Sequence, residues 1–188
     1  MGLDSDIKTI SKNLAKKQKD FDNVMGLVRD VIRESAQTIT LLHNGDARNA
    51  SKRLGAAGRM VSSLKGYDSV FGYHAKQAYQ EYAEAVIFFS IKKDGAVPSR
   101  KKLGIDEESY LMGLMDVMGE LKREVLESLR ENRVKDAELY FKNMREIYDG
   151  TRSIRFAEAV LNGFRRKQDV ARIQVESAGS ELLSYKHR

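Results

Sequence analysis

Apolar residues recur every three or four positions along nearly the whole chain, which is the spacing of amphipathic α-helices. In the first part of the chain this row includes Ile7, Ile10 and Leu14 and continues to Ile32. Runs of β-branched residues are few, and Pro98 is the single proline. Because proline interrupts helices and strand patterns are scarce, the sequence predicts an all-α fold.

Turn residues such as Asn44-Gly45 and Asp94-Gly95 divide this pattern into seven helices. The helices are expected to cover residues 4–42, 47–64, 68–93, 106–131, 134–148, 151–162 and 164–185. The first is long enough to run along the whole body or to project into a partner. No linker rich in Pro, Gly or Ser interrupts the 188 residues, which predicts a single helical domain over residues 1–188.

Two pairs of acidic residues lie inside the most apolar of these helices. Glu81 and Glu84 are three positions apart in QEYAEAVIFF. Asp116 and Glu120 are four apart in LMGLMDVMGEL, so each pair shares one helix face. Only Glu120 has a basic residue within one helical turn, Arg123. An unpaired carboxylate in a partly dry interior costs several kcal/mol, so we expect a cation to converge on these acids.

The two helices that carry the acids, 68–93 and 106–131, are expected to form an antiparallel hairpin around the loop 94–104. The first acid pair lies about ten to thirteen residues before the end of its helix, and the second lies about ten to fourteen after the start of its own. At 1.5 Å per residue the two pairs would meet at one level. Four carboxylates at one level would form a site for Mg²⁺ or Mn²⁺, which prefer oxygen ligands.

Two alternatives compete with this interpretation of the acids. Each pair could face solvent or meet lysine and arginine residues of another helix. The acids could also belong to a di-metal oxidase, because di-iron bundle proteins bind their metals through Glu-x-x-His motifs. This sequence contains no such motif. A site made only of oxygen ligands therefore favours hydrolysis of phosphate esters over oxygen chemistry.

The composition narrows the function classes further. The chain has no cysteine, which excludes disulfides, thiolate metal sites and cysteine nucleophiles. Its net charge of +6 favours an anionic partner such as nucleic acid, and residues 92–102 and 152–172 are its most basic stretches. The N-terminal residues lack the apolar segment of a signal peptide, and no apolar run reaches 18 residues. We therefore expect a soluble cytoplasmic protein that has no membrane partner.

Four stretches of the sequence resemble the translin superfamily, and most closely its translin-associated factor X (TRAX) branch. In chain order they are FDNVMGLVRDVIRESAQTITLLHN, GYHAKQAYQEYAEAVIFF, SYLMGLMDVMGELKREV and LYFKNMREIYDG. The resemblance covers the chain from about residue 20 to the last helix and implies a seven-helix, translin-like bundle. TRAX-type proteins form, with translin, the octameric endoribonuclease that promotes activation of the RNA-induced silencing complex.

The resemblance also implies a metal-dependent active site. In the family this site comes from the glutamates of Gln-Glu-Tyr-x-Glu-Ala and the acids of Asp-x-x-Gly-Glu-Leu, and both motifs are intact here. It follows that Glu81, Glu84, Asp116 and Glu120 would bind Mg²⁺ or Mn²⁺ and catalyse RNA hydrolysis. Translin itself lacks the full set of acids. The chain has neither the long polar insertion nor the basic N-terminal extension of eukaryotic TRAX, so it resembles a compact prokaryotic or archaeal relative.

Contacts to the RNA backbone are expected from basic side chains. Arg123, one turn beyond Glu120, would either hold the scissile phosphate or neutralise Glu120. The remaining candidates lie on the first helix or around the basic loop: Arg29, Arg33, His43, Lys92, Lys93, Arg100 and Lys101.

The family resemblance implies an oligomer that binds RNA. We expect either a homo-oligomer, most simply an octamer, or a hetero-oligomer with a translin-type subunit. Apolar residues of the last two helices would form its interface: Ile154, Phe156, Val160, Leu161 and Phe164. The competing function is a non-catalytic, translin-type scaffold that binds RNA or single-stranded DNA and whose acids pair across the bundle.

Overall fold

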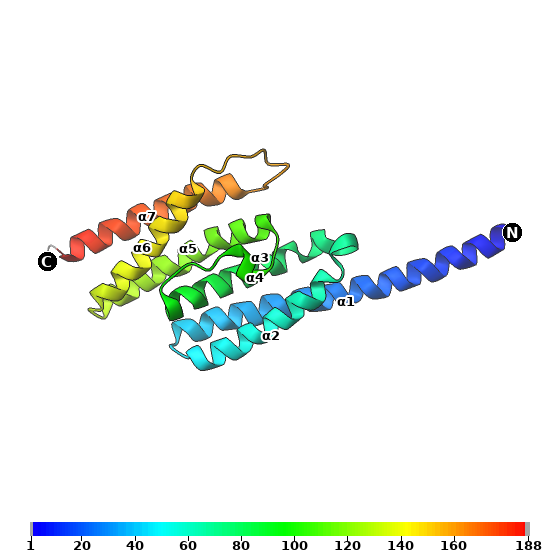
Figure 1. Cartoon of the computed structure of the whole chain (residues 1–188), viewed down its shortest axis with the longest axis horizontal. Helices are drawn as coiled ribbons and strands as arrows, with labels where there is room; N and C mark the ends of the chain where they lie inside the picture. The colour runs from blue at the N-terminus through cyan, green and yellow to red at the C-terminus, as the bar shows by residue number, and fades with distance from the viewer. Residues whose placement is uncertain (1, 187–188) are drawn as a thin grey trace.

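Seven α-helices and no strand make up the computed structural model, which describes residues 2–186 (Figure 1). The all-α fold and the number of helices expected from the sequence are confirmed for this range. No helix within it is long and apolar enough to cross a membrane. The helices are α1 (Leu3–His43), α2 (Ala47–Lys65), α3 (Asp68–Asp94), α4 (Arg100–Leu103), α5 (Glu107–Arg130), α6 (Val134–Thr151) and α7 (Phe164–Lys186).

Most helices begin at a side-chain cap or end at a glycine where the sequence predicted. Asp46 accepts a hydrogen bond from the backbone N–H of Asn49 at the start of α2, and Asp106 accepts one from Ser109 at the start of α5. Gly95 ends α3 in the left-handed conformation, with φ 73°. Six of the expected helices therefore have close counterparts in α1, α2, α3, α5, α6 and α7.

The prediction of a helix over residues 151–162 is wrong. α6 continues to Thr151, and residues 152–163 then form turns and irregular structure up to Gly163, whose φ is 74°. The apolar residues of this segment do not share one buried face, since Leu161 is buried whereas Phe156 and Val160 are exposed. The seventh helix is instead α4, a single turn within the segment expected to be a loop.

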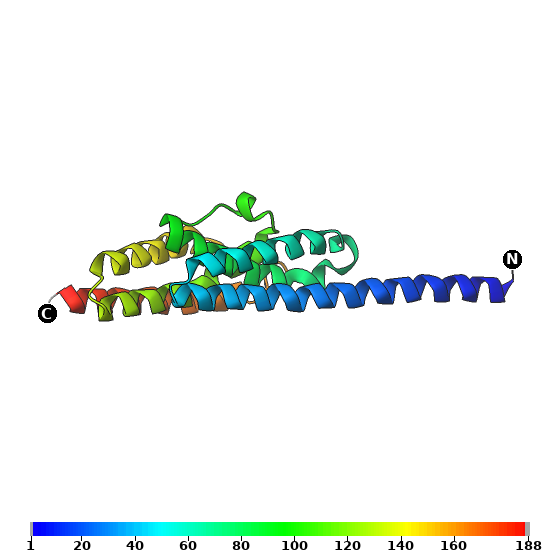
Figure 2. The ribbon, with the colours of Figure 1, turned by 90° about the horizontal axis from the view of Figure 1, so that it is seen from below.

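α3 and α5 run in the same direction, so the expected antiparallel hairpin is also wrong. Three side-chain contacts join the two helices: Lys76–Glu108, Gln80–Asp116 and Lys92–Glu124. From one contact to the next the residue number increases on both helices, as it does when two helices are parallel. The segment 95–106, which carries α4, runs back along the bundle before α5 begins (Figures 1 and 2). An extended chain spans about 3.3 Å per residue, so a segment of this length can pass several turns of α3. Hydrophobic spacing does not specify helix direction, which is why the sequence did not reveal it.

α3 and α5 form the centre of the bundle. α1 and α2 pack on α3, whereas α6 and α7 pack on α5. α1, α3, α5 and α7 all run in one direction, and α2 and α6 run in the other (Figure 1). Two of the residues expected at an oligomer interface, Leu161 and Phe164, belong to the buried core. Ile154 packs against this core, and Phe156 and Val160 remain exposed.

The first half of α1 extends beyond the body of the protein (Figures 1 and 2). Residues 3–19 are all exposed, and burial on α1 begins near Phe21 and Val24. The second half of the long first helix therefore packs along the body, and its first half projects away from it.

Candidate active site

Four acids from two helices meet where α3 packs against α5. α3 supplies Glu81 and Glu84, and α5 supplies Asp116 and Glu120. The charges of the other three all act on Glu84, so Glu84 lies within electrostatic range of each of them. The parallel helices thus place the two acid pairs at one level, although the sequence predicted an antiparallel hairpin.

A glycine lets the two helices approach closely at this point. A Cβ atom on Gly113 of α5 would lie 2.5 Å from the Cβ of Ala83 and 3.0 Å from the backbone nitrogen of Glu84. Any larger residue would therefore push the two backbones apart. Gly113 and Ala83 set the distance between the two acid pairs.

Burial and mutual repulsion make the α3 acids difficult to ionise. Burial, followed by the charges of Asp116, Glu81 and Glu120, raises the pKa of Glu84 to about 8. Burial and then Asp116 raise the pKa of Glu81 as well. The charge of Lys167 opposes both shifts without cancelling either. Among the described residues, the acid cluster therefore carries more negative charge than its neighbours neutralise.

Lys167 is a member of this site that the sequence did not single out. Its ammonium group, in the first turns of α7, forms an ion pair with Asp116. The amide of Gln80 donates to the other carboxylate oxygen of Asp116 at 2.5 Å. Lys167 lies within the basic stretch 152–172, so charge alone pointed to the region, but only the packing of α7 on α5 identifies the residue.

His43, one of the residues expected to contact RNA, bridges two acids of α5. Its Nε2 lies 2.5 Å from an oxygen of Glu120, and its Nδ1 lies 2.7 Å from an oxygen of Glu124. Hydrogen bonds to Glu120 and then Glu124 raise the pKa of His43, which favours an imidazolium that donates from both nitrogens. Lys92 pairs with Glu124 at 2.8 Å, so this second RNA candidate also belongs to the carboxylate network. Burial opposes the shift at Glu124, but bonds from His43 and Lys92 hold its pKa below the ordinary value.

We expect a His43→Gln chain to lose about 2 kcal/mol of stability at pH 6, because it loses hydrogen bonds between charged groups. The pKa of His43 is raised above 6.5 in the folded state. Its contribution is therefore complete below pH 6.5 and is lost as pH rises through the folded-state pKa. Urea unfolding of both chains at pH 6 and pH 9 should show the difference shrinking. His74→Gln, an exposed histidine packed against Phe21, is the control. A difference that did not change with pH would show that the His43 ring is neutral.

The donor chemistry of the cluster fits a hard divalent cation, although the side chains are not arranged around a single point. No three histidine or acidic side chains within residues 2–186 are grouped closely enough to hold a metal ion. Asp116 and Glu120 are bound by Lys167 and His43, respectively. Glu81 and Glu84 supply further carboxylate oxygens, which are the donors that Mg²⁺ and Mn²⁺ select. The residue types therefore suit such an ion, but two of the four carboxylates, those of Asp116 and Glu120, already pair with Lys167 and His43.

The other RNA candidates lie at the surface. Arg123 is exposed and lines a groove of about 570 Å³ together with His43 and Lys92. Arg33 pairs with Asp30 at 2.9 Å. The rest are exposed or half-buried around α1, the end of α3 and α4: Arg29, Lys93, Arg100 and Lys101. Three of the expected contacts therefore come together in this groove, and His43 connects it to Glu120.

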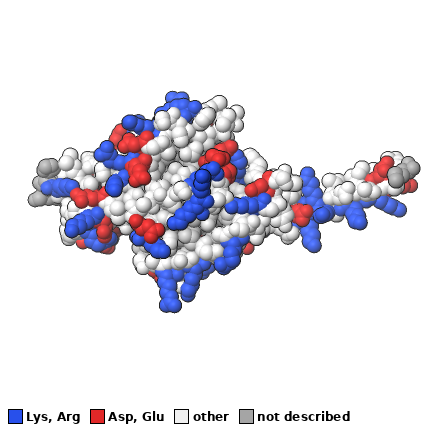
Figure 3. Space-filling model, viewed as in Figure 1, with Lys and Arg blue, Asp and Glu red and all other residues white. Residues whose placement is uncertain are grey.

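α2 is a basic surface that the sequence reasoning missed. It has five basic residues and no acidic one, and all five are exposed: Arg48, Lys52, Arg53, Arg59 and Lys65. Basic side chains gather along the edge of the molecule where α2 lies, and others line the projecting part of α1 (Figure 3). Net charge over a single helix is the signal that could have identified it.

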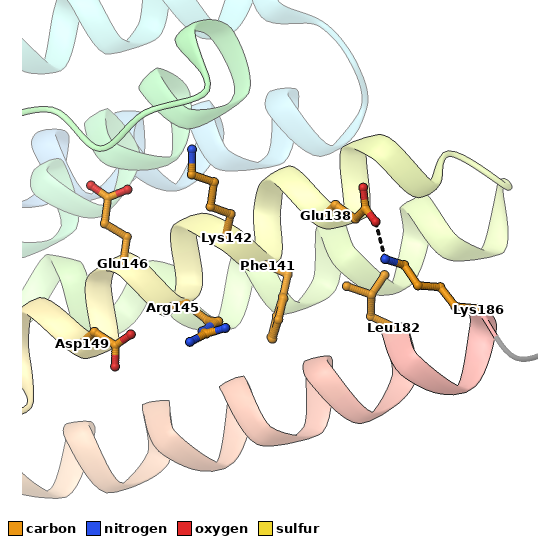
Figure 4. A pocket seen from close by; sticks show the side chains of 8 residues that line it. All are labelled: Glu138, Phe141, Lys142, Arg145, Glu146, Asp149, Leu182 and Lys186. Carbon is orange, nitrogen blue, oxygen red and sulfur yellow. Dashed lines mark ion pairs between the residues drawn. The ribbon is translucent and has the colours of Figure 1, made fainter.

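A second groove lies between α6 and α7, away from the acid cluster (Figure 4). It measures about 520 Å³ and contains both acidic and basic side chains around Phe141 and Leu182. Glu138 and Lys186 form an ion pair at one end of it. None of the four clustered acids lines this groove, so it is not part of the candidate site.

Comparison with known proteins gives a consistent result. A structure of AfC3PO in complex with duplex RNA superimposes with a TM-score of 0.88 at 26% identity, and covers 96% of each chain. A second structure of AfC3PO gives 0.84 at 25% identity, again over 96% of each chain. The structure of apo-NeC3PO, at 18% identity, shares the fold with a TM-score of 0.84, over 95% of this chain and 96% of the other.

Sequence relatives agree with the structures. The uncharacterized protein MJ0175 of Methanocaldococcus jannaschii is 32% identical over 177 residues, which cover 92% of this chain and 79% of MJ0175. The model of the Translin family matches residues 6–180. The chain therefore belongs to the Translin family.

Proposed function

We propose that this protein is a metal-dependent endoribonuclease of the TRAX type, which hydrolyses RNA phosphodiester bonds within an oligomer. The observation that carries the proposal is the position of Glu84 within electrostatic range of Asp116, Glu81 and Glu120, which together with burial raises the pKa of Glu84 to about 8. The similarity to AfC3PO, whose structure was determined with duplex RNA, supports RNA as the polymer.

The electrostatics of the cluster favour a functional role over a purely structural one. A buried carboxylate whose pKa is raised destabilises the folded chain at neutral pH. Groups that destabilise the folded state in this way occur most often at catalytic or binding sites. The four acids are therefore better explained by a bound cation and substrate than by the stability of the bundle.

The residues of the site suggest a division of labour. A bound Mg²⁺ or Mn²⁺ would polarise the phosphodiester and lower the pKa of a bound water. Glu84, whose pKa is raised to about 8, can accept a proton from the attacking water once its carboxyl is ionised. Lys167 is the ammonium group nearest the acids and can move from Asp116 to a phosphate oxygen of the substrate. His43 holds Glu120 in one orientation.

The test is cleavage of end-labelled RNA, single-stranded and duplex, in Mg²⁺ or Mn²⁺. Glu81→Gln and Asp116→Asn should each reduce the rate by at least about 10²-fold, because each removes a charged donor from the site. Glu127→Gln, an acid of α5 that pairs with Arg130 at the surface, should cleave as the native chain does. RNA binding and oligomer size are measured in parallel, since both should remain unchanged. Equal cleavage by native chain and variants would overturn the proposal.

One observation favours a second function, a scaffold that binds RNA or single-stranded DNA without cutting it. Asp116 and Glu120 are each paired with a cation of the protein itself, Lys167 and His43, as expected of acids that pair across a bundle. The scaffold predicts binding that chelators do not affect and no cleavage by the native chain. The cleavage assay therefore separates the two functions.

A further inference from the structure

The projecting part of α1, residues 3–19, is the largest unpartnered feature of the molecule within the described range. We call it the arm (Figures 1 and 2). Four apolar residues lie on one face of the arm: Leu3, Ile7, Ile10 and Leu14, whose exposed fractions are 75%, 55%, 50% and 59%. An isolated helix of this length is only marginally stable in water, so a partner on this face would stabilise it.

The apolar face of the arm continues the face that packs into the core. Spacings of four and three lead from Leu14, through Lys17, to Phe21, Val24 and Val28. Val24 and Val28 are buried, and Phe21 packs against the buried core. This alternation of three and four is the spacing at which helices pack side by side in coiled coils. The arm thus has the pattern of a helix-packing surface but no helix against it.

We propose that the arms of two copies of this chain pair side by side in antiparallel orientation. The four apolar residues read Leu, Ile, Ile, Leu at spacings of four, three and four, so the row is the same from either end. A two-fold axis across the helix requires such a self-complementary surface. It would place Leu3 against Leu14 of the second copy and Ile7 against its Ile10.

The charges of the arm favour this orientation over a parallel one. Asp4 and Asp6 lie at its outer end, and Lys8, Lys12 and Lys16 lie further in. Parallel arms would place the aspartates of the two copies side by side and the lysines likewise. Antiparallel arms place the acidic end of each copy at the level of the lysine-containing part of the other and separate the two acidic ends, which reduces like-charge repulsion.

The lysines on the outer face of the arm point to RNA as an alternative partner. Phosphates would engage the lysines but would leave the apolar row in water. The apolar row is the part of the arm that lacks a partner. A second arm would cover this row, whereas RNA would not. The paired stretch is only about 16 Å long, at 1.5 Å per residue, so it buries less than a standard stable interface. Covalent trapping is therefore a better measurement than size alone.

The absence of cysteine from the sequence allows a direct cross-linking test. Full-length Leu3→Cys and Leu14→Cys chains with different tags are mixed and oxidised without RNA or added metal. The mixed disulfide should exceed either same-variant disulfide by about ten-fold, because antiparallel pairing brings residue 3 of one copy next to residue 14 of the other. Two copies of residue 3 would lie about 16 Å apart along the helices, too far for a disulfide.

The matched control is a mixture of Ser5→Cys and Lys12→Cys chains. These two positions lie at the same level of the proposed pair but face outward, so the mixture should give no excess of the mixed disulfide.

Adding Ile7→Asp to the Leu3→Cys chain should abolish the cross-link, whereas adding Thr9→Asp should not. Disulfides within single variants would show parallel arms, and cross-links that form only when RNA is added would show an RNA-bound arm. Either result, or no cross-link at all, overturns the proposal. The outcome does not depend on whether the acid cluster cleaves RNA.

Discussion

A Gly113→Ala chain is expected to unfold roughly 5–10 °C below the native chain, a loss of about 2–3 kcal/mol at this chain length. Alanine is normally the better helix former by about 1 kcal/mol. Here the added Cβ would lie 2.5 Å from the Cβ of Ala83 and 3.1 Å from the backbone oxygen of Gln80. Because backbone atoms of α3 cannot rotate away as a flexible side chain can, the two helices must separate. Thermal unfolding followed by circular dichroism measures the difference.

Gly119→Ala is the matched control, since it makes the same change on the same helix. Its Cβ would meet only the amide of Gln174, at an ordinary contact distance of 3.5 Å. This variant should therefore be as stable as the native chain or slightly more stable. If Gly113→Ala and Gly119→Ala had equal stability, the close approach of α3 and α5 at Gly113 would be refuted. Gly113→Ala should also slow cleavage, because it moves Glu84 relative to Asp116.

The local features of the fold could be predicted because they depend on neighbours in sequence. Hydrophobic spacing and turn residues located α1, α2 and α3 to within a few residues. The segment 151–162 misled the prediction, because apolar spacing by itself does not show whether the residues share a buried face. In the structure, Leu161 enters the core and Val160 points to solvent.

The direction of α5 relative to α3 could not be predicted, yet the two acid pairs lie on neighbouring helices as expected. Both acid pairs lie near the middle of their helices, so they reach the same level whether the helices run parallel or antiparallel. The helical spacing of the acids and the lack of nearby cations were therefore sufficient to single out Glu84 and the three acids whose charges act on it.

The partners of the acids could not be predicted, because they come from helices far away in sequence. Lys167 reaches Asp116 from α7, and His43 reaches Glu120 and Glu124 from the end of α1. A search for cations within one helical turn finds neither. The same limit explains why His43 and Lys92 were expected to bind RNA, since a basic residue in the sequence does not reveal the carboxylate that it meets.

A Glu84→Gln chain is expected to be more stable than the native chain by about 3 kcal/mol at pH 8, and to lose cleavage by about 10³-fold or more. Glutamine has a similar shape but no charge, so it removes the repulsion from Asp116, Glu81 and Glu120 together with the cost of burial. It also removes a carboxylate that the proposed reaction needs. Stability gained at the expense of activity is the behaviour expected of a functional residue.

The gain should depend on pH in a defined direction. The Glu84 carboxyl loses its proton near pH 4.5 in the unfolded chain and at about 8 in the folded one. Between these values the folded state holds more protons than the unfolded state, so the free energy of unfolding of the native chain falls as pH rises from about 4.5 to 8. Glutamine does not titrate, so the variant should lack this part of the slope, and the two chains should be nearly equal in stability at pH 4.5.

Urea unfolding at pH 4.5, 6 and 8, measured with and without Mn²⁺, tests the site independently of the cleavage assay. Mn²⁺ should stabilise the native chain at pH 8, because a ligand that binds only the folded state raises its stability, and it should stabilise Glu84→Gln much less. Glu127→Gln provides the control for loss of a surface carboxylate. A gain at pH 8 without any response to Mn²⁺ would leave Glu84 as a buried acid that destabilises the fold without binding a cation, and would favour the scaffold over the nuclease. A gain together with a response to Mn²⁺ confined to the native chain would mean that a cation relieves the repulsion within the cluster.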